Sequence, residues 1–186
     1  MNQKIRIIGG KFRGRKITFP VISGLRPTTN RIRETLFNWL MPVIQQSRCL
    51  DLFAGSGALG FEALSRGAGE VWFVEASLLA YKYLKQNAVK LGCSDINIMH
   101  MQAEIYLSKL TTQFDIIFLD PPFTQHHHMP IIHLLQKHNT LSQTGWLYVE
   151  APCRLQLDPI IWKLQKNQHA GTIHSALYTY INKAIQ

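Results

Sequence analysis

Three acidic residues occupy positions where buried strands are expected to end. Asp51 lies at the end of one apolar run, Glu75 closes a second, and Asp120 follows a third. A carboxylate inside an apolar strand is costly unless it has a partner. At such positions a carboxylate can accept hydrogen bonds from the hydroxyl or amino groups of a ligand. The three residues are therefore the first candidates for binding and catalysis.

The glycine-containing segment Asp51–Gly57 is a candidate cofactor loop. It follows an apolar strand, and apolar residues recur at helical spacing from residue 58 onward. Glycines in such a turn let a ligand approach the backbone N–H groups at the start of the helix. Glu75 follows Gly55 by about 20 residues, the spacing at which an acidic side chain accepts hydrogen bonds from a ribose. The pattern predicts a nucleoside-containing cofactor. A glycine turn alone is also compatible with a tight strand–helix connection without a ligand.

A second candidate loop, Asp120-Pro121-Pro122-Phe123, follows the strongly apolar residues 114–119. Prolines have no N–H donor and a fixed φ, so the Asp120 carboxylate and the Pro121 carbonyl are acceptors on a stiff loop. Two neighbouring acceptors suit an –NH2 group, which has two donors. The ring of Phe123 offers a face on which an unstacked base can lie. This loop predicts a site for the exocyclic amino group of a nucleobase.

The positive charge is concentrated at the start of the chain. The formal net charge is +9, and no acidic residue precedes Glu34. Nine of the 20 lysines and arginines lie before that point: Lys4, Arg6, Lys11, Arg13, Arg15, Lys16, Arg26, Arg31 and Arg33. Such a segment favours a polyanionic partner, most simply nucleic acid. A solvated arm that improves solubility is the alternative.

Two short segments, 5–8 and 15–19, alternate in polarity and predict a hairpin joined by residues 9–14. An isolated hairpin is marginally stable, so this one should pack on the main domain and present Lys11, Arg13 and Arg15 to phosphates. A helix follows up to residue 40, with Thr28 or Thr29 as its N-cap. Arg31 and Arg33 are expected on the exposed side of its first turns.

Length and composition are those of one compact domain. The chain has 186 residues, of which 46% are hydrophobic and 17% charged. No apolar run is long enough to span a bilayer, and the first residues lack the apolar segment of a signal peptide, so we expect a cytoplasmic protein. The three cysteines have no disulfide or metal spacing. Although residues 126–128 are all histidines, no further ligand spacing is evident, and no metal site is predicted.

Apolar segments near residues 50, 73, 98, 117 and 147 alternate with helical patterns. This alternation predicts a mostly parallel sheet with helices on both faces. Two final strands within 160–166 and 172–181 would close the chain as a hairpin and form an antiparallel edge. Glu150, in the segment 145–150, is interpreted as a sheet residue.

Taken together, these motifs resemble a known family. The glycine loop with Glu75 resembles the cofactor motif of class I S-adenosylmethionine-dependent methyltransferases. Asp120-Pro121-Pro122-Phe123 resembles the motif of enzymes that methylate exocyclic amino groups of bases. The segments 8–14 and 26–40 are similar to the RsmD type, which methylates guanine N2 in bacterial 16S ribosomal RNA. The resemblance extends over essentially the whole chain.

The resemblance implies an α/β, Rossmann-like class I methyltransferase fold. Its seven-stranded, mostly parallel sheet would have an antiparallel terminal strand and a small N-terminal β-hairpin extension. Residues 1–24 would be the RNA-contacting hairpin and residues 25–186 the methyltransferase domain. The partner would be 16S ribosomal RNA, within the small subunit or an assembly intermediate. The enzyme would act as a monomer and would have no membrane partner.

The resemblance also assigns site residues. Catalysis would fall to Asp120, Pro121, Pro122 and Phe123. S-adenosylmethionine would be bound by Thr28, Thr29, Asp51, Phe53, Gly55, Gly57, Glu75, Ala76, Ser77, Gln102, Ala103 and Asp120. Many relatives have Asp or Asn where this chain has Gln102, so the contact to the adenine amino group departs from the family pattern. RNA would be bound by Lys11, Arg13, Arg15, Arg26 and Arg31.

Other functions fit the sequence less well. An adenine-N6 or other nucleic-acid amino methyltransferase shares the Asp120 loop, but DNA enzymes of that kind usually need a separate recognition region. An NAD-dependent dehydrogenase shares the glycine pattern and leaves the Asp120 loop and the basic segment unexplained. A non-enzymatic RNA-binding module leaves Asp51 and Glu75 unexplained.

Overall fold

The computed structural model describes residues 2–22, 28–122 and 127–181. The strands are β1 (Asn2–Arg6), β2 (Lys16–Pro20), β3 (Arg48–Asp51), β4 (Glu70–Glu75), β5 (Ile96–His100), β6 (Phe114–Leu119), β7 (Leu141–Ala151), β8 (Trp162–Ala170) and β9 (Ile173–Tyr180). The helices are α1 (Asn30–Leu40), α2 (Ala58–Ser65), α3 (Leu78–Leu91), α4 (Ala103–Lys109) and α5 (His128–Lys137). Phe123 and Arg26, two residues assigned to the site from the sequence, lie outside the described residues.

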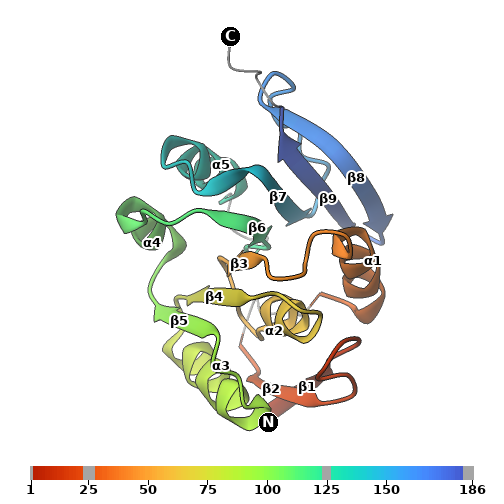
Figure 1. Cartoon of the computed structure of the whole chain (residues 1–186), viewed down its shortest axis with the longest axis vertical. Coiled ribbons are helices and arrows are strands. Elements are labelled where there is room, and N and C mark those ends of the chain that lie inside the picture. Colours follow the sequence, from red (N-terminus) through yellow and green to blue (C-terminus); the bar gives the residue numbers. More distant parts are fainter. Residues whose placement is uncertain (1, 23–27, 123–126, 182–186) are drawn as a thin grey trace.

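The central sheet has seven strands in the order β5-β4-β3-β6-β7-β9-β8 (Figure 1). The five strands from β5 to β7 are parallel, and β9 is antiparallel to both β7 and β8. The expected α/β fold with an antiparallel terminal strand is therefore confirmed. That strand, β9, lies one position inside the edge, because the β8–β9 hairpin places β8 outermost and parallel to β7.

Helices cover both faces of this sheet. Helices α1, α2 and α3 lie on one face, and α4 and α5 lie on the other (Figure 1). Each face has its own apolar cluster, with Phe37, Phe73 and Phe118 in the first and Leu135 and Leu147 in the second. Strand β6 contributes to both clusters, which explains why residues 114–119 are almost continuously apolar. Within the described residues, no helix has the length and apolar content needed to cross a bilayer.

The N-terminal hairpin packs on the main domain, as predicted. Backbone N–H groups of Ile8 and Gly9 donate to the two carboxylate oxygens of Glu62 on α2, each at 2.8 Å. The backbone N–H of Lys11 donates to the carbonyl of Ser65 at 2.7 Å. Gly10 lies so close that an added Cβ would be 1.6 Å from that carbonyl oxygen. Only glycine fits this contact, which joins the hairpin loop to the end of α2.

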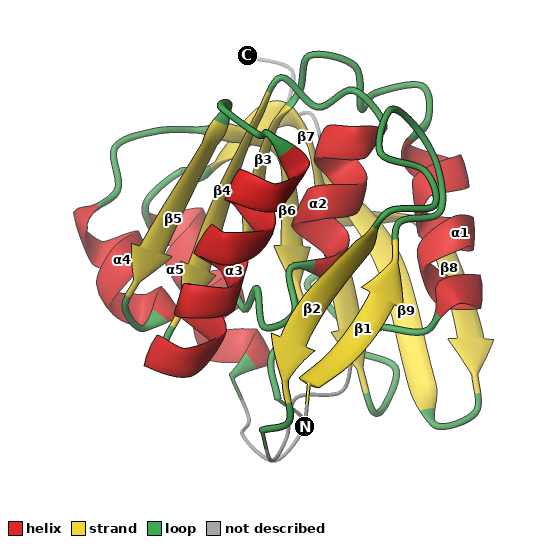
Figure 2. Ribbon diagram, turned by 90° about the horizontal axis from the view of Figure 1, so that it is seen from below, coloured by secondary structure: helices red, strands yellow, loops and turns green. Residues whose placement is uncertain are grey.

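The hairpin loop lies at the opposite end of the sheet from the carboxyl ends of the parallel strands. The loop contacts the last residues of α2, and Arg15 donates to the carbonyls of Lys90 and Leu91 at the end of α3. Helices that follow parallel strands end at the amino edge of the sheet. Figure 2 shows β2 running from this loop in the same direction as β4 and β5.

The expectation that Arg33 is exposed is wrong. Its side chain is fully buried, and its Nη1 lies 3.6 Å from Glu62 Oε2. Its Nη2 donates to the carbonyl of Arg6 at 2.9 Å and to Asn30 Oδ1 at 2.7 Å. Burial lowers the pKa of Arg33, and Glu62 opposes that change. Arg33 therefore joins α1 to the hairpin and α2, and its charge is not available to RNA.

Candidate active site

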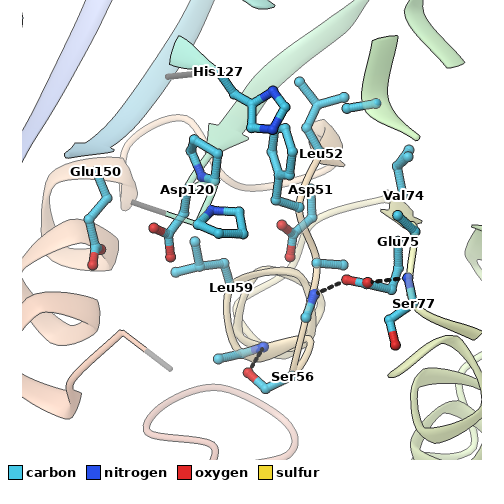
Figure 3. A pocket seen from close by; sticks show the side chains of 18 of the residues that line it. Asp51, Leu52, Ser56, Leu59, Val74, Glu75, Ser77, Asp120, His127 and Glu150 are labelled. Carbon is cyan, nitrogen blue, oxygen red and sulfur yellow. Dashed lines mark hydrogen bonds between the residues drawn. The ribbon is translucent and has the colours of Figure 1, made fainter. Parts of the chain in front are cut away.

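A cavity of about 550 Å³ opens at the carboxyl ends of the parallel strands. Figure 3 shows that its walls come from the ends of β3, β4, β6 and β7 and from the start of α2. A cavity of this size holds a small-molecule ligand. The residues predicted from the sequence that line it are Thr28, Asp51, Phe53, Gly55, Glu75, Ala76, Ser77, Gln102, Ala103, Asp120, Pro121 and Pro122.

Three carboxylates lie at the ends of three neighbouring strands of this cavity: Asp51 and Glu150, which are buried, and Asp120, which is partly exposed. Asp51 pairs in register with Phe118, two residues before Asp120, so both acids lie on the same face of the sheet. Leu119 pairs with Val149, so Asp120 and Glu150 are the next residues along adjacent strands. All three side chains therefore face α1 and α2. The described part of the cavity has an acidic floor at this face.

Asp51 is held by the start of α2. Its side chain is 2% exposed, and the backbone N–H of Gly60 donates to its Oδ2 at 3.1 Å. Burial is the main cause that raises the pKa of Asp51 to about 7. The hydrogen bond from Gly60 lowers the pKa, and the charge of Glu75 raises it further. A cationic ligand would favour the ionised form of this group.

Asp120 lies beside Thr28, which immediately precedes the N-cap of α1. Thr28 Oγ1 donates to Asp120 Oδ2 at 3.2 Å. Burial raises the pKa of Asp120 well above its usual value, with a further contribution from Glu150. Pro121 belongs to the same cavity wall. The two residues that carry the predicted acceptors thus both line the cavity.

Glu75 connects two backbone segments at the cavity. Gly55 N–H donates to Glu75 Oε2 and Ser77 N–H donates to Oε1, both at 2.7 Å (Figure 3). Ser77 also caps α3, where its hydroxyl accepts from the N–H of Ala80. These bonds fix the carboxylate between the glycine loop and the end of β4. The Glu75 side chain is therefore positioned before a ligand arrives.

Two described residues that were predicted to bind the cofactor do not line the cavity. Thr29 is the N-cap of α1, where its hydroxyl accepts from the N–H of Ile32. Gly57 has φ +78° at the N-cap of α2, and an added Cβ would lie 2.6 Å from the ring of Phe61. Both residues shape the helix starts beside the cavity. Their assignment to cofactor binding stays a prediction.

Several cavity residues were not predicted. Glu150 was interpreted as a sheet residue, yet it lines the cavity and is 3% exposed. His127 also lines the cavity; its ring centroid lies 5.7 Å from that of Phe53, and its Nδ1 is 2.9 Å from Glu104 Oε1. The strand-end rule that identified Asp51 and Asp120 applies equally to Glu150. The remaining walls are mainly apolar and come from Ile22, Leu52, Leu59, Val74, Met101 and Ile173.

The adenine side predicted from the sequence forms one part of the cavity wall. Gln102 is the N-cap residue of α4, and Ala103 begins that helix. Across from them, Ala76 and Ser77 follow β4, whose pairing partner is β5. The ends of β4 and β5 therefore bring the four residues together. Among the described residues, no group of three or more metal-binding side chains is present.

The predicted RNA-binding residues are distributed over two regions. Lys11 and Arg13 are exposed on the hairpin loop, away from the cavity. Arg15 is exposed as well, but its guanidinium is bonded to the end of α3. Arg31 is exposed on the first turn of α1, close to the cavity residue Thr28. The two regions therefore lie toward opposite ends of the sheet.

Comparisons with known proteins give consistent matches. The model of a family described as conserved hypothetical protein 95 matches residues 5–179. The chain is 42% identical over 177 residues to ribosomal RNA small subunit methyltransferase D of Escherichia coli, covering 94% of this chain and 89% of that protein. It is 43% identical over 180 residues to the Haemophilus influenzae protein of the same name, covering 94% and 93%.

Solved structures agree in fold. A putative methyltransferase from Escherichia coli superposes with a TM-score of 0.88 at 42% identity, covering 96% of this chain and 98% of that one. A putative methylase from Haemophilus influenzae gives a TM-score of 0.81 at 40% identity, with coverage of 95% and 98%. A ribosomal protein L11 methylase at 17% identity, covering 82% and 80%, has a TM-score of 0.63, a likeness of fold alone.

Proposed function

Because this chain belongs to the RsmD-type family of methyltransferases, we propose that it transfers a methyl group from S-adenosylmethionine to the N2 amine of a guanine in 16S ribosomal RNA. The observation that carries this proposal is that Asp120 and Pro121 line the same cavity as Glu75. One loop supplies acceptors for an amino group, and the other supplies acceptors for a nucleoside.

The cavity fits this cofactor by the chemistry of its side chains. Asp51 is a buried carboxylate with a raised pKa, and a cationic ligand compensates such a group. Glu75 is fixed where it can accept hydrogen bonds from ribose hydroxyls. Ala76, Ser77, Gln102 and Ala103 would border the adenine, while Thr28 would lie near the methionine end. The cofactor supplies a methyl group on a positively charged sulfur, which needs no further activation.

The chain's own contribution concerns the amine. The lone pair of an exocyclic amine is delocalised into the base and is a poor nucleophile. Hydrogen bonds from the amino group to Asp120 and to the Pro121 carbonyl would orient the nitrogen and direct its lone pair toward the methyl group. Orientation of this kind contributes strongly to rate. The nitrogen gains a methyl group and loses one proton, which would leave after the transfer.

RNA binding would use both basic regions. We propose that residues 1–24 contact the RNA backbone through Lys11 and Arg13, while residues 25–186 hold the cofactor and the target base. Arg31, beside the cavity, and Arg26 would contact phosphates near the target. The base must leave its stack to reach the cavity, so the substrate is a loop or extruded nucleotide. The partner would be the small subunit or an assembly intermediate, in the cytoplasm.

The test is methyl transfer from labelled cofactor into ribosomal RNA, free and bound to small-subunit proteins, followed by identification of the methylated nucleoside. We expect N2-methylguanosine. N6-methyladenosine would replace the proposal with the adenine alternative. Asp120→Ala should abolish turnover and leave cofactor affinity nearly unchanged. Loss of cofactor affinity together with turnover would mean that the loop does not hold the amine.

A further inference from the structure

Glu150 is a buried carboxylate beside Asp120 that the proposed methyl transfer does not use. It lies on β7 next to the end of β6, and Figure 3 shows its side chain on the same side of the cavity as Asp120. The two groups are close enough for the charge of Glu150 to raise the pKa of Asp120. Two neighbouring carboxylates at one wall of the cavity present several acceptor positions, which suit a ligand with more than one donor.

The side chain of Glu150 is held in a fixed position. Tyr148 Oη donates to Glu150 Oε2 at 2.8 Å. The Tyr148 ring in turn packs edge-on against Phe118, with centroids 6.4 Å apart. Both rings are fully buried. A carboxylate has about four acceptor positions, so the bond from Tyr148 orients it and leaves it able to accept from a ligand.

The edge of guanine presents donors that match this pair of acids. On guanine, the N2 amine lies next to the N1–H, which is a second donor. On adenine, the N6 amine lies next to N1, which has no hydrogen and is an acceptor. If Asp120 and the Pro121 carbonyl hold the amine, N1 of the base lies at the neighbouring position. In guanine this N1 is a hydrogen-bond donor, and in adenine it is an acceptor.

We propose that Glu150 accepts the N1–H of the target guanine and thereby selects guanine over adenine. This inference rests on the proposed guanine N2 methylation and names the residue that reads the base. A carboxylate opposite N1 of adenine would face a lone pair, so adenine would lose a hydrogen bond and meet repulsion. Sites that hydrogen-bond a substrate group reject analogues that lack the group, because buried polar atoms are left unpaired.

The alternative is that Glu150 only anchors Tyr148 within the sheet. The two roles are distinguished by a base analogue. 2-Aminopurine carries the same C2 amine as guanine and lacks the N1–H. Single-turnover methylation is measured on two RNAs that differ only in guanosine or 2-aminopurine at the target. The enzymes compared are the wild type, Glu150→Gln and Tyr148→Phe. Tyr148→Phe is the control, because it removes only the hydroxyl that donates to Glu150.

The wild type should methylate the guanosine RNA about 10- to 100-fold faster than the 2-aminopurine RNA, the effect of one charge-assisted hydrogen bond. In Glu150→Gln this preference should fall to within about threefold, because the amide can donate to N1 of 2-aminopurine. Tyr148→Phe should keep most of the preference. Equal wild-type rates on the two RNAs would overturn the inference, and so would an unchanged preference in Glu150→Gln.

The wild-type comparison needs no variant and stands even if Glu150→Gln does not fold. Failure of the proposed function is visible separately. If the wild-type product from unmodified RNA is not N2-methylguanosine, the proposed function fails, and the inference about Glu150 fails with it. If N2-methylguanosine forms but the wild type methylates both RNAs equally fast, only the role of Glu150 is refuted. The same holds if N2-methylguanosine forms and Glu150→Gln keeps the wild-type preference.

Discussion

Arg33 and Glu62 form an ion pair in which both side chains are fully buried. Glu62 also accepts from Arg66 Nε at 2.8 Å and from the backbone of Ile8 and Gly9. One carboxylate therefore joins α1, α2 and the N-terminal hairpin. Burial of an ion pair is not in itself strongly stabilising, but removal of one partner leaves an uncompensated charge.

Glu62→Gln should destabilise the protein by about 3 to 5 kcal/mol, because Arg33 would remain buried without a counter-charge. The matched control is Glu70→Gln, which breaks the Arg48–Glu70 pair, whose side chains are 49% and 34% exposed. An exposed pair contributes about 1 kcal/mol or less. Urea denaturation measures both free energies of unfolding. Equal losses in the two variants would contradict the role given to Glu62.

Gly10→Ala should detach the hairpin loop from α2. Gly10 has φ +73°, and the added Cβ would collide with the carbonyl of Ser65. Gly14→Ala is the control, since Gly14 has φ +83° and no atom within 4 Å of an added Cβ. The positive φ costs about 1 to 2 kcal/mol in each variant, and the collision should add at least about 2 kcal/mol in Gly10→Ala.

Limited proteolysis of the first 20 residues, together with denaturation, measures this difference. Gly10→Ala should be cleaved in the hairpin much faster than Gly14→Ala. Similar cleavage of the two variants would mean that the close approach of the loop to α2 is not needed to hold the hairpin.

Asp51→Asn should change how the stability of the ligand-free protein depends on pH. The pKa of Asp51 is raised from 3.8 to about 7, chiefly by burial, so the folded chain binds a proton that the unfolded chain releases. The stabilisation is complete below about pH 4 and is lost as pH rises to about 7. The asparagine keeps an acceptor for Gly60 N–H and does not ionise.

The variant should therefore gain stability relative to the wild type as pH rises, on the order of a few kcal/mol between pH 4 and pH 8. Asp120 and Glu75 remain in both proteins, so the difference between the two proteins isolates Asp51. Denaturation curves at pH 5 and pH 8 without cofactor test this. A difference that does not change with pH would show that Asp51 is ionised in the folded protein.

The sequence predicted the cavity because acidic residues that end apolar runs come together where the parallel strands end, at the carboxyl edge of the sheet. Asp51, Glu75 and Asp120 each follow or close an apolar run, and the fold brings those ends together. The same rule applies to Glu150 and was not used for it. The sequence thus predicts which residues lie at strand ends. Whether such a residue packs within the sheet or lines the cavity depends on its neighbours on adjacent strands, which the sequence does not show.

Two features, the burial of Arg33 and the position of the hairpin loop, could not be predicted because they depend on contacts between segments distant in the sequence. Helical spacing places Arg33 beside the apolar residue Phe37, but only its partner Glu62, 29 positions further on, explains why a charge is tolerated there. The hairpin was predicted from alternation, and its charged loop from composition. Which end of the sheet the loop lies at is decided by Gly10 and Ser65, and no local pattern shows that contact.

The position of the hairpin loop leads to a prediction about RNA length. Arg15 bonds the loop to the end of α3, and Ser77, the N-cap of α3, lines the cavity. With 14 residues at 1.5 Å each, α3 separates the two regions by about 20 Å. An oligonucleotide that only fills the cavity should therefore not reach Lys11 and Arg13, whereas a longer structured RNA should contact both regions.

Lys11→Ala combined with Arg13→Ala should reduce the slope of log affinity against log salt by about 1.5 to 2 for a long RNA, because each lost phosphate contact removes close to one unit. The slope for a short oligonucleotide with the target base should not change. Arg15 is left intact because its replacement would also remove the bonds to α3. Lys109→Ala, on α4 across the sheet, should affect neither RNA. An unchanged slope with the long RNA would remove the hairpin loop from the binding surface, and an equal change with both RNAs would place the loop beside the target base.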